Sequence, residues 1–129
     1  MALDMALSSK KSAKPIQLDF DEILQILPQK PPFVMVAQVT EMMSGKRIIA
    51  IKNANISGLC GMEIFGAKKP RKFIYPETLL LETMGQTGLI LFKYSIGRPK
   101  EEMKIYLTLS DVRYFKRINP SVRLVIEAT

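Results

Sequence analysis

Residues 76–95 restrict the possible folds of this chain more than any other segment, because they predict one long helix with apolar side chains around most of its circumference. Pro76 suits the first turn of a helix, and Glu77 beside it favours the positive end of the helix dipole. A surface helix has one apolar stripe, whereas here the apolar side chains spread much further. They are Leu79, Leu80, Leu81, Met84, Leu89, Ile90, Leu91 and Phe92. The sequence therefore predicts a helix that is buried on several sides.

Two glycines inside this predicted helix also indicate that it is buried. Gly85 and Gly88 each cost about 1 kcal/mol of helix propensity relative to alanine. Their presence indicates close approach of the helix backbone to a neighbouring sheet. The expected architecture is α+β, with an antiparallel sheet wrapped around a long central helix.

The first half of the chain predicts a short helix followed by a hairpin. Asp19 with Glu22 three residues later is typical of a capping box, and the helix is expected to run through Ile26. Residues 33–43 and 46–56 are rich in Val, Ile and Met and are joined by Ser44 and Gly45, a pattern that predicts two antiparallel strands.

The last third predicts further strands after a turn at residues 97–99. Ile105, Leu107 and Leu109 alternate within residues 103–114, and residues 122–127 begin another strand. Residue 129 falls inside that strand, so we interpret the C-terminal strands of the domain as truncated, with an open sheet edge for another chain to cover.

Length and composition predict one domain that associates with other chains. A chain of 129 residues with 47% hydrophobic side chains builds one core but lies near the lower limit of comfortable stability. We expect residues 1–15 to be a disordered arm and 16–129 to be the single domain. The apolar run at residues 79–92 is too short for the roughly 20 residues of a membrane span. The lone Cys60 is read as a small core residue that suits a reducing compartment, and hence the cytoplasm.

The charge balance favours an acidic partner. The 19 Lys and Arg residues exceed the 12 Asp and Glu residues, for a net charge of +7. The basic residues form clusters at Lys68, Lys69, Arg71 and Lys72, at Arg98 and Lys100, and at Arg113, Lys116 and Arg117. A solvated face is the simple interpretation of these clusters. No nucleic-acid-binding motif accompanies them. With no histidine and one cysteine, the sequence predicts no metal site, and nothing in it predicts a cofactor.

Several segments together resemble the FabZ-type 3-hydroxyacyl-acyl carrier protein dehydratases. They are residues 53–65 and 75–86, Leu27-Pro28-Gln29-Lys30-Pro31-Pro32-Phe33, Gly45 to Asn53, and Ser110 to Arg117. The family has a His-Arg pair where this chain has Gln29 and Lys30. The resemblance covers residues from about 23 to 120. It implies a hotdog fold, an acyl thioester on an acyl carrier protein as partner, and a homodimer or higher oligomer.

The resemblance also implies half of a catalytic dyad. In the family, a histidine in a loop works with a glutamate on the central helix of the partner subunit. An ungapped alignment from Lys52 places Ile64 at the histidine position, Glu82 at the glutamate position and Gln86 at a family glutamine. The chain contains no histidine at all. The expected substrate-binding residues are Phe65, Gly66, Pro76, Glu77, Thr78 and Gln86, since helix N-termini bind developing anions.

The missing histidine decides what chemistry to expect. Dehydration of a 3-hydroxyacyl thioester removes a weakly acidic proton and expels hydroxide, so it needs a base and an acid. Loss of a well-placed general base costs about two to four orders of magnitude in rate. Glu82 has two interpretations: a solvent-exposed or hydrogen-bonded carboxylate on a polar strip with Gln86, which shares its helix face, or a functional group that orients water or thioester.

Three functions remain open from the sequence. The first is a FabZ-like dehydratase of fatty-acid or related acyl-chain synthesis that is degenerate, or that forms a heteromer in which a partner supplies the histidine opposite Glu82. The second is an acyl-thioesterase in which Glu82 activates water. The third is a non-enzymatic carrier-binding or scaffold subunit. Its docking residues would be Lys68, Lys69, Arg71, Lys72, Lys116 and Arg117.

Overall fold

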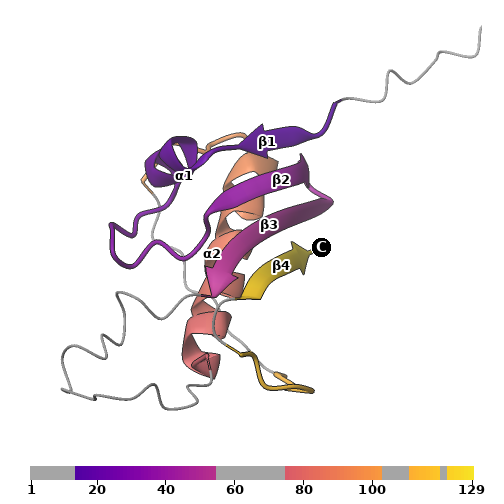
Figure 1. Cartoon of the computed structure of the whole chain (residues 1–129). Coiled ribbons are helices and arrows are strands. Elements are labelled where there is room, and N and C mark those ends of the chain that lie inside the picture. The colour runs from indigo at the N-terminus through magenta and orange to yellow at the C-terminus, as the bar shows by residue number, and fades with distance from the viewer. Residues whose placement is uncertain (1–13, 55–74, 103–110, 120–121) are drawn as a thin grey trace, which may run out of the picture.

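A computed structural model describes residues 14–54, 75–102, 111–119 and 122–129 of the chain (Figure 1). The described residues form four strands and two helices. In chain order these are β1 (Ile16–Leu18), α1 (Phe20–Ile26), β2 (Gln38–Met43), β3 (Arg47–Ala54), α2 (Glu77–Ser95) and β4 (Val122–Ala128).

The strands form one antiparallel sheet in the order β1-β2-β3-β4. Strand β3 pairs along its length with β4, from Ile48 opposite Ala128 to Ala54 opposite Val122. Helix α2 lies across one face of this sheet (Figure 1), and it contacts both β3 and β4. The predicted α+β architecture, an antiparallel sheet against a long helix as in the hotdog fold, is confirmed.

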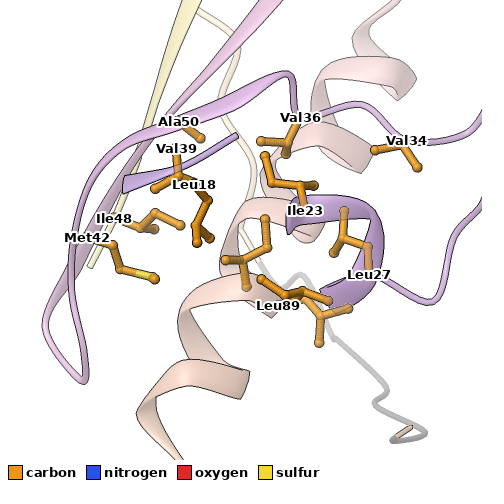
Figure 2. Packing of buried hydrophobic residues seen from close by; sticks show 12 residues of the cluster. Leu18, Ile23, Leu27, Val34, Val36, Val39, Met42, Ile48, Ala50 and Leu89 are labelled. Carbon is orange, nitrogen blue, oxygen red and sulfur yellow. The ribbon is translucent and has the colours of Figure 1, made fainter. Parts of the chain in front are cut away.

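The core lies between the inner face of the sheet and the two helices. Leu18, Val39, Met42, Ile48 and Ala50 belong to the core from three strands. Ile48 and Ala50 follow the two-residue period of a strand, whereas a register shift between Val39 and Glu41 lets both Val39 and Met42 reach the core. Figure 2 shows these side chains meeting Ile23 and Leu27 of the α1 region and Leu89 of α2. This packing fixes α2 against the sheet by its second half.

The predicted capping box at the start of α1 is confirmed. Asp19 Oδ1 accepts a hydrogen bond from the Glu22 backbone N–H at 2.8 Å, and Glu22 Oε2 accepts one from the Asp19 backbone N–H at 2.8 Å. The helix ends at Ile26, the residue that the sequence predicted. Local hydrogen bonding therefore sets the start of α1.

The predicted hairpin is confirmed, but its first strand is shorter than expected. Strand β2 begins at Gln38 rather than at Phe33, because the backbone of residues 33–35 bonds to a side chain of α2 instead of to a strand. Gly45 has a φ of 73° in the turn, which glycine adopts at little steric cost. The prediction for residues 55 and 56 lies outside the described residues.

The predicted strand over residues 103–114 is wrong at its C-terminal end. Residues 111–114 are exposed and belong to no strand. Residues 111–114 lack the alternation of apolar and polar side chains that Ile105, Leu107 and Leu109 give to residues 103–110. The prediction for residues 103–110 lies outside the described part of the chain. The predicted strand beginning at Val122 is confirmed as β4.

Helix α2 has the predicted extent, but its burial differs from the prediction. Its buried residues are Thr83, Gln86, Thr87, Leu89, Ile90 and Lys93. Met84 and Phe92 are 46% and 45% exposed, and a Cβ atom on Gly88 would meet no described atom within 4 Å. The predictions of burial on several sides and of close sheet approach at Gly88 are therefore wrong for the described chain, because the described sheet covers only one face of α2. We name its other face, with Leu81, Met84, Gly88 and Phe92, the outer stripe.

A buried lysine joins the two helices. Lys93 is 4% exposed, and its Nζ donates a hydrogen bond to the Ile26 carbonyl oxygen at 2.6 Å. That carbonyl lies at the end of α1, where carbonyls have no partner within the helix. Burial lowers the pKa of Lys93 below its ordinary 10.5, while the negative charges of Glu101 and Glu102 oppose this shift.

We expect this lysine to make stability rise with pH in alkaline solution. Because the pKa of Lys93 is lower in the folded chain, the unfolded chain binds more protons just below pH 10.5. The free energy of unfolding of the wild type should therefore increase relative to that of a Lys93→Met variant as the pH rises toward 10.5. Chemical denaturation of both proteins measures this, and the other titrating groups cancel in the difference. A difference that stays constant with pH would contradict the prediction.

Candidate functional site

The site begins with the segment that joins α1 to β2, which Gln86 of α2 holds in place. Gln86 Oε1 accepts a hydrogen bond from the Met35 backbone N–H at 2.7 Å, and Gln86 Nε2 donates one to the Phe33 carbonyl oxygen at 2.7 Å. Gln86 is 1% exposed. A buried amide that pairs with two backbone groups fixes the position of this segment against α2.

The remaining proton of the Gln86 amide goes to Glu82, one helical turn earlier. Gln86 Nε2 donates to Glu82 Oε1 at 2.9 Å, and Gln29 Nε2 donates to the same oxygen at 3.4 Å. The predicted sharing of one helix face by Glu82 and Gln86 is confirmed. We call Gln29, Glu82 and Gln86 the amide–carboxylate cluster.

This arrangement fixes one oxygen of an exposed carboxylate. Two amide donors hold Glu82 Oε1, whereas Glu82 Oε2 has no hydrogen-bond partner among the described residues. Glu82 is exposed and hydrogen-bonded, as one of its two interpretations expected. A carboxylate held at one oxygen presents the other in a defined direction, where it can accept a proton or a hydrogen bond from a ligand or from water.

The start of α2 lies one turn before the cluster. Pro76 is the N-cap residue, so the helix begins at Glu77, one residue later than predicted. Glu77 and Thr78 are exposed, and no side chain of the described residues caps this end. The first backbone N–H groups of a helix have no partner within it, so they are free to bind an acceptor.

Comparison with known proteins identifies the family. No family model matches the chain. The chain is 32% identical over 124 residues to the 3-hydroxyacyl-acyl-carrier-protein dehydratase FabZ of Haemophilus ducreyi, an alignment that covers 95% of this chain and 78% of the relative. The chain belongs to the FabZ dehydratase family. The FabZ of Thiobacillus denitrificans is 34% identical over 113 residues, with 86% and 75% covered. That of Pseudoalteromonas translucida is 36% identical over 104 residues, with 80% and 67% covered.

Many of the predicted FabZ-type site residues lie outside the described part of the chain. These are Ile64, Phe65, Gly66, Lys68, Lys69, Arg71 and Lys72, together with Cys60. Lys116 and Arg117 are described, and both are exposed. The Tyr75 backbone N–H donates to the Ile118 carbonyl oxygen at 2.8 Å. The segment that carries these two basic residues therefore lies beside the residue that precedes α2.

Sequence reasoning missed two residues beside this FabZ-type site. Gln29 was noted only for its place in a motif, and nothing local indicated that it contacts a carboxylate 53 residues away.

Tyr75 is 2% exposed, and its hydroxyl has no hydrogen-bond partner among the described residues. Burial raises the pKa of Tyr75, and the neighbouring Thr83 side chain opposes the rise. Thr83 donates its own proton to the Leu79 carbonyl oxygen at 2.7 Å. The sequence did contain one indication of buried polar contacts here, the polar residues Thr83, Gln86 and Thr87 spaced along one face of an apolar helix.

We expect a Tyr75→Phe substitution to raise the free energy of unfolding by about 1 kcal/mol, since a buried hydroxyl without a partner costs about 1–3 kcal/mol. Chemical denaturation measures the change. Tyr114→Phe is the matched control, because Tyr114 is exposed, and it should leave stability unchanged. A loss of stability in Tyr75→Phe would mean that the hydroxyl is bonded.

The described residues offer neither a metal site nor a membrane-spanning helix. Among residues 14–54, 75–102, 111–119 and 122–129, no three His, Cys, Asp or Glu side chains lie close enough to hold a metal ion. Within the same ranges, neither helix has the length and hydropathy that crossing a membrane requires.

Proposed function

We propose that this chain binds or acts on 3-hydroxyacyl thioesters of an acyl carrier protein, as a dehydratase-like protein of fatty-acid or related acyl-chain synthesis. The observation that supports this most is the Glu82 carboxylate, held at one oxygen by Gln29 and Gln86 in a chain of the FabZ family. The curated relatives are named as dehydratases of this substrate class. We place the protein in the cytoplasm, which its single cysteine favours.

The absence of histidine suggests that the activity is degenerate or depends on a partner. Glu82 supplies one proton-transfer group, and the reaction needs a second one. We take Ile64 to occupy the position of the family's histidine. A histidine-bearing homologue that joins this chain in a heteromer would place its imidazole opposite Glu82.

The outer stripe of α2 supports association with a second chain. Its apolar members Met84 and Phe92 are both exposed in the single chain. Exposed apolar surface of this kind favours protein contacts. The same stripe serves a homodimer or a heteromer, so the test has to distinguish the two.

Mass spectrometry of a 3-hydroxyacyl carrier protein tests this function. The substrate is incubated with this protein alone, with a histidine-bearing FabZ relative whose own dyad glutamate is replaced by glutamine, and with the mixture. Loss of water only in the mixture supports a shared site. Loss of water with this protein alone identifies a histidine-free dehydratase. An unchanged acyl group in every sample, with no complex between the two proteins, contradicts both versions.

A thioesterase is the second candidate. The Oε2 atom of the exposed Glu82, which has no partner among the described residues, favours it, because a fixed carboxylate can take a proton from an attacking water. The same mass spectra distinguish this reaction, since hydrolysis releases the acyl chain and leaves the carrier protein unacylated. Retention of the acyl chain excludes it.

A non-catalytic carrier-binding subunit is the third candidate. The exposed Lys116 and Arg117 favour it, together with the basic residues at 68–72. Replacing Lys116 and Arg117 by Glu should weaken carrier binding, and more salt should weaken it in the wild type. Lys46→Glu is the control, because the Ser44–Gly45 turn beside it bonds to Tyr94 and Ser95 at the far end of α2. Carrier binding that responds neither to the double substitution nor to salt contradicts docking at these residues.

A further inference from the structure

The amide of Gln29 has one bonded end and one free end. Gln29 Nε2 donates to Glu82 Oε1 at 3.4 Å, whereas Gln29 Oε1 is buried without a hydrogen-bond partner among the described residues. The reverse orientation of the amide would place its oxygen against a carboxylate oxygen, so the bonded orientation is the one that the carboxylate selects. The unpartnered atom is therefore a hydrogen-bond acceptor.

The carboxylate that Gln29 bonds to carries a second acceptor. Gln29 Oε1 shares its carbon with the nitrogen that bonds to Glu82, and Glu82 Oε2 is also without a partner in the described chain. Gln86 contributes no further donor, because Phe33 and Glu82 take its two amide protons. Both oxygens can only accept hydrogen bonds, so the cluster fits a ligand that brings a hydrogen-bond donor.

We propose that Gln29 determines specificity for a hydroxyl group on the bound acyl chain. Gln29 Oε1 accepts the hydrogen bond of that hydroxyl, while Gln29 Nε2 holds Glu82 beside it. A buried acceptor that a hydroxyl satisfies is left unpaired when the ligand lacks that hydroxyl, which makes the site discriminate between the two ligands. This inference rests on the proposed binding of acyl thioesters.

Binding of two matched ligands tests the inference. The probes are a 3-hydroxyacyl pantetheine amide and the same compound without the hydroxyl, in which the amide in place of the thioester prevents turnover. Isothermal titration calorimetry gives both dissociation constants. We expect the wild type to bind the hydroxyl compound about 3- to 10-fold more tightly, the effect of one neutral hydrogen bond. Gln29→Met, which keeps the length of the side chain, should lose this preference and bind the other compound as the wild type does.

Two controls separate specificity from folding. Gln25→Met changes an exposed glutamine of α1 in the same way and should keep the preference. If Gln29→Met fails to fold, Gln29→Asn moves the amide back by one methylene and should reduce the preference instead. The inference is overturned, but acyl binding is not, if the wild type binds both compounds equally. The same holds if Gln29→Met still prefers the hydroxyl compound. Failure of the wild type to bind either compound overturns the proposed function and this inference with it.

Discussion

Replacement of Glu82 by Gln is expected to lower the turnover of acyl thioesters by about 100- to 10,000-fold, the usual contribution of a positioned proton-transfer group. The carboxamide has the size of the carboxylate, and its oxygen can still accept the hydrogen bonds of Gln29 and Gln86. The variant should therefore keep its fold and lose only the ability to take up a proton. Mass spectrometry of the acyl carrier protein measures the rate of whichever reaction the wild type performs, dehydration or hydrolysis.

The control for this variant is Glu102→Gln, which makes the same chemical change at an exposed residue beyond the other end of α2. It should retain wild-type turnover. Turnover that is unchanged in Glu82→Gln would remove Glu82 from the chemistry of both candidate enzymes and leave the binding function.

Replacement of Gln86 by Leu is expected to lower the free energy of unfolding by about 2–5 kcal/mol. The substitution leaves the buried Met35 N–H and the part-buried Phe33 carbonyl without partners, and a buried unpaired group costs about 1–3 kcal/mol. Domains of this kind are stable by about 5–15 kcal/mol in total, so the loss is a large fraction. Urea denaturation measures it.

Two further variants test the cause of that loss. Gln38→Leu, at an exposed position of β2, should change stability little. Gln86→Glu keeps the shape of the side chain and an acceptor for Met35 but loses both donated protons, so we expect a loss of stability there as well. A loss below about 1 kcal/mol in Gln86→Leu would show that water or another group replaces the amide.

Elements governed by neighbouring residues were predicted correctly from the sequence. The capping box of Asp19 and Glu22 set the start of α1, and Pro76 marked the start of α2 to within one residue. Gly45, with its positive φ, marked the turn of the hairpin. Each of these depends on backbone preferences or hydrogen bonds within a few residues, and such short-range effects can be read from the order of the amino acids.

The burial of α2 and the contacts of its polar residues were decided by the tertiary structure. Hydrophobic residues around most of the helix predicted burial on several sides, yet the buried side includes the polar Thr83, Gln86 and Thr87. Thr83 and Thr87 are buried with their hydroxyls bonded to carbonyls one turn earlier in α2, whereas Gln86 bonds to the backbone of the 33–35 segment. Met84 and Phe92 lie on the face that the described chain leaves uncovered.

The order of the amino acids was enough to indicate the family and to place Glu82 and Gln86 on one face of α2, because helix spacing brings residues four apart together whatever surrounds them. Only the tertiary structure brought Gln29 to Glu82, across 53 residues of chain, and left its amide oxygen buried without a partner among the described residues. The difference lies in how far along the chain each effect acts. Helix periodicity and capping act over a few residues, whereas the contact of Gln29 depends on how Gln86 binds the backbone of residues 33–35 once α1, the sheet and α2 have packed together.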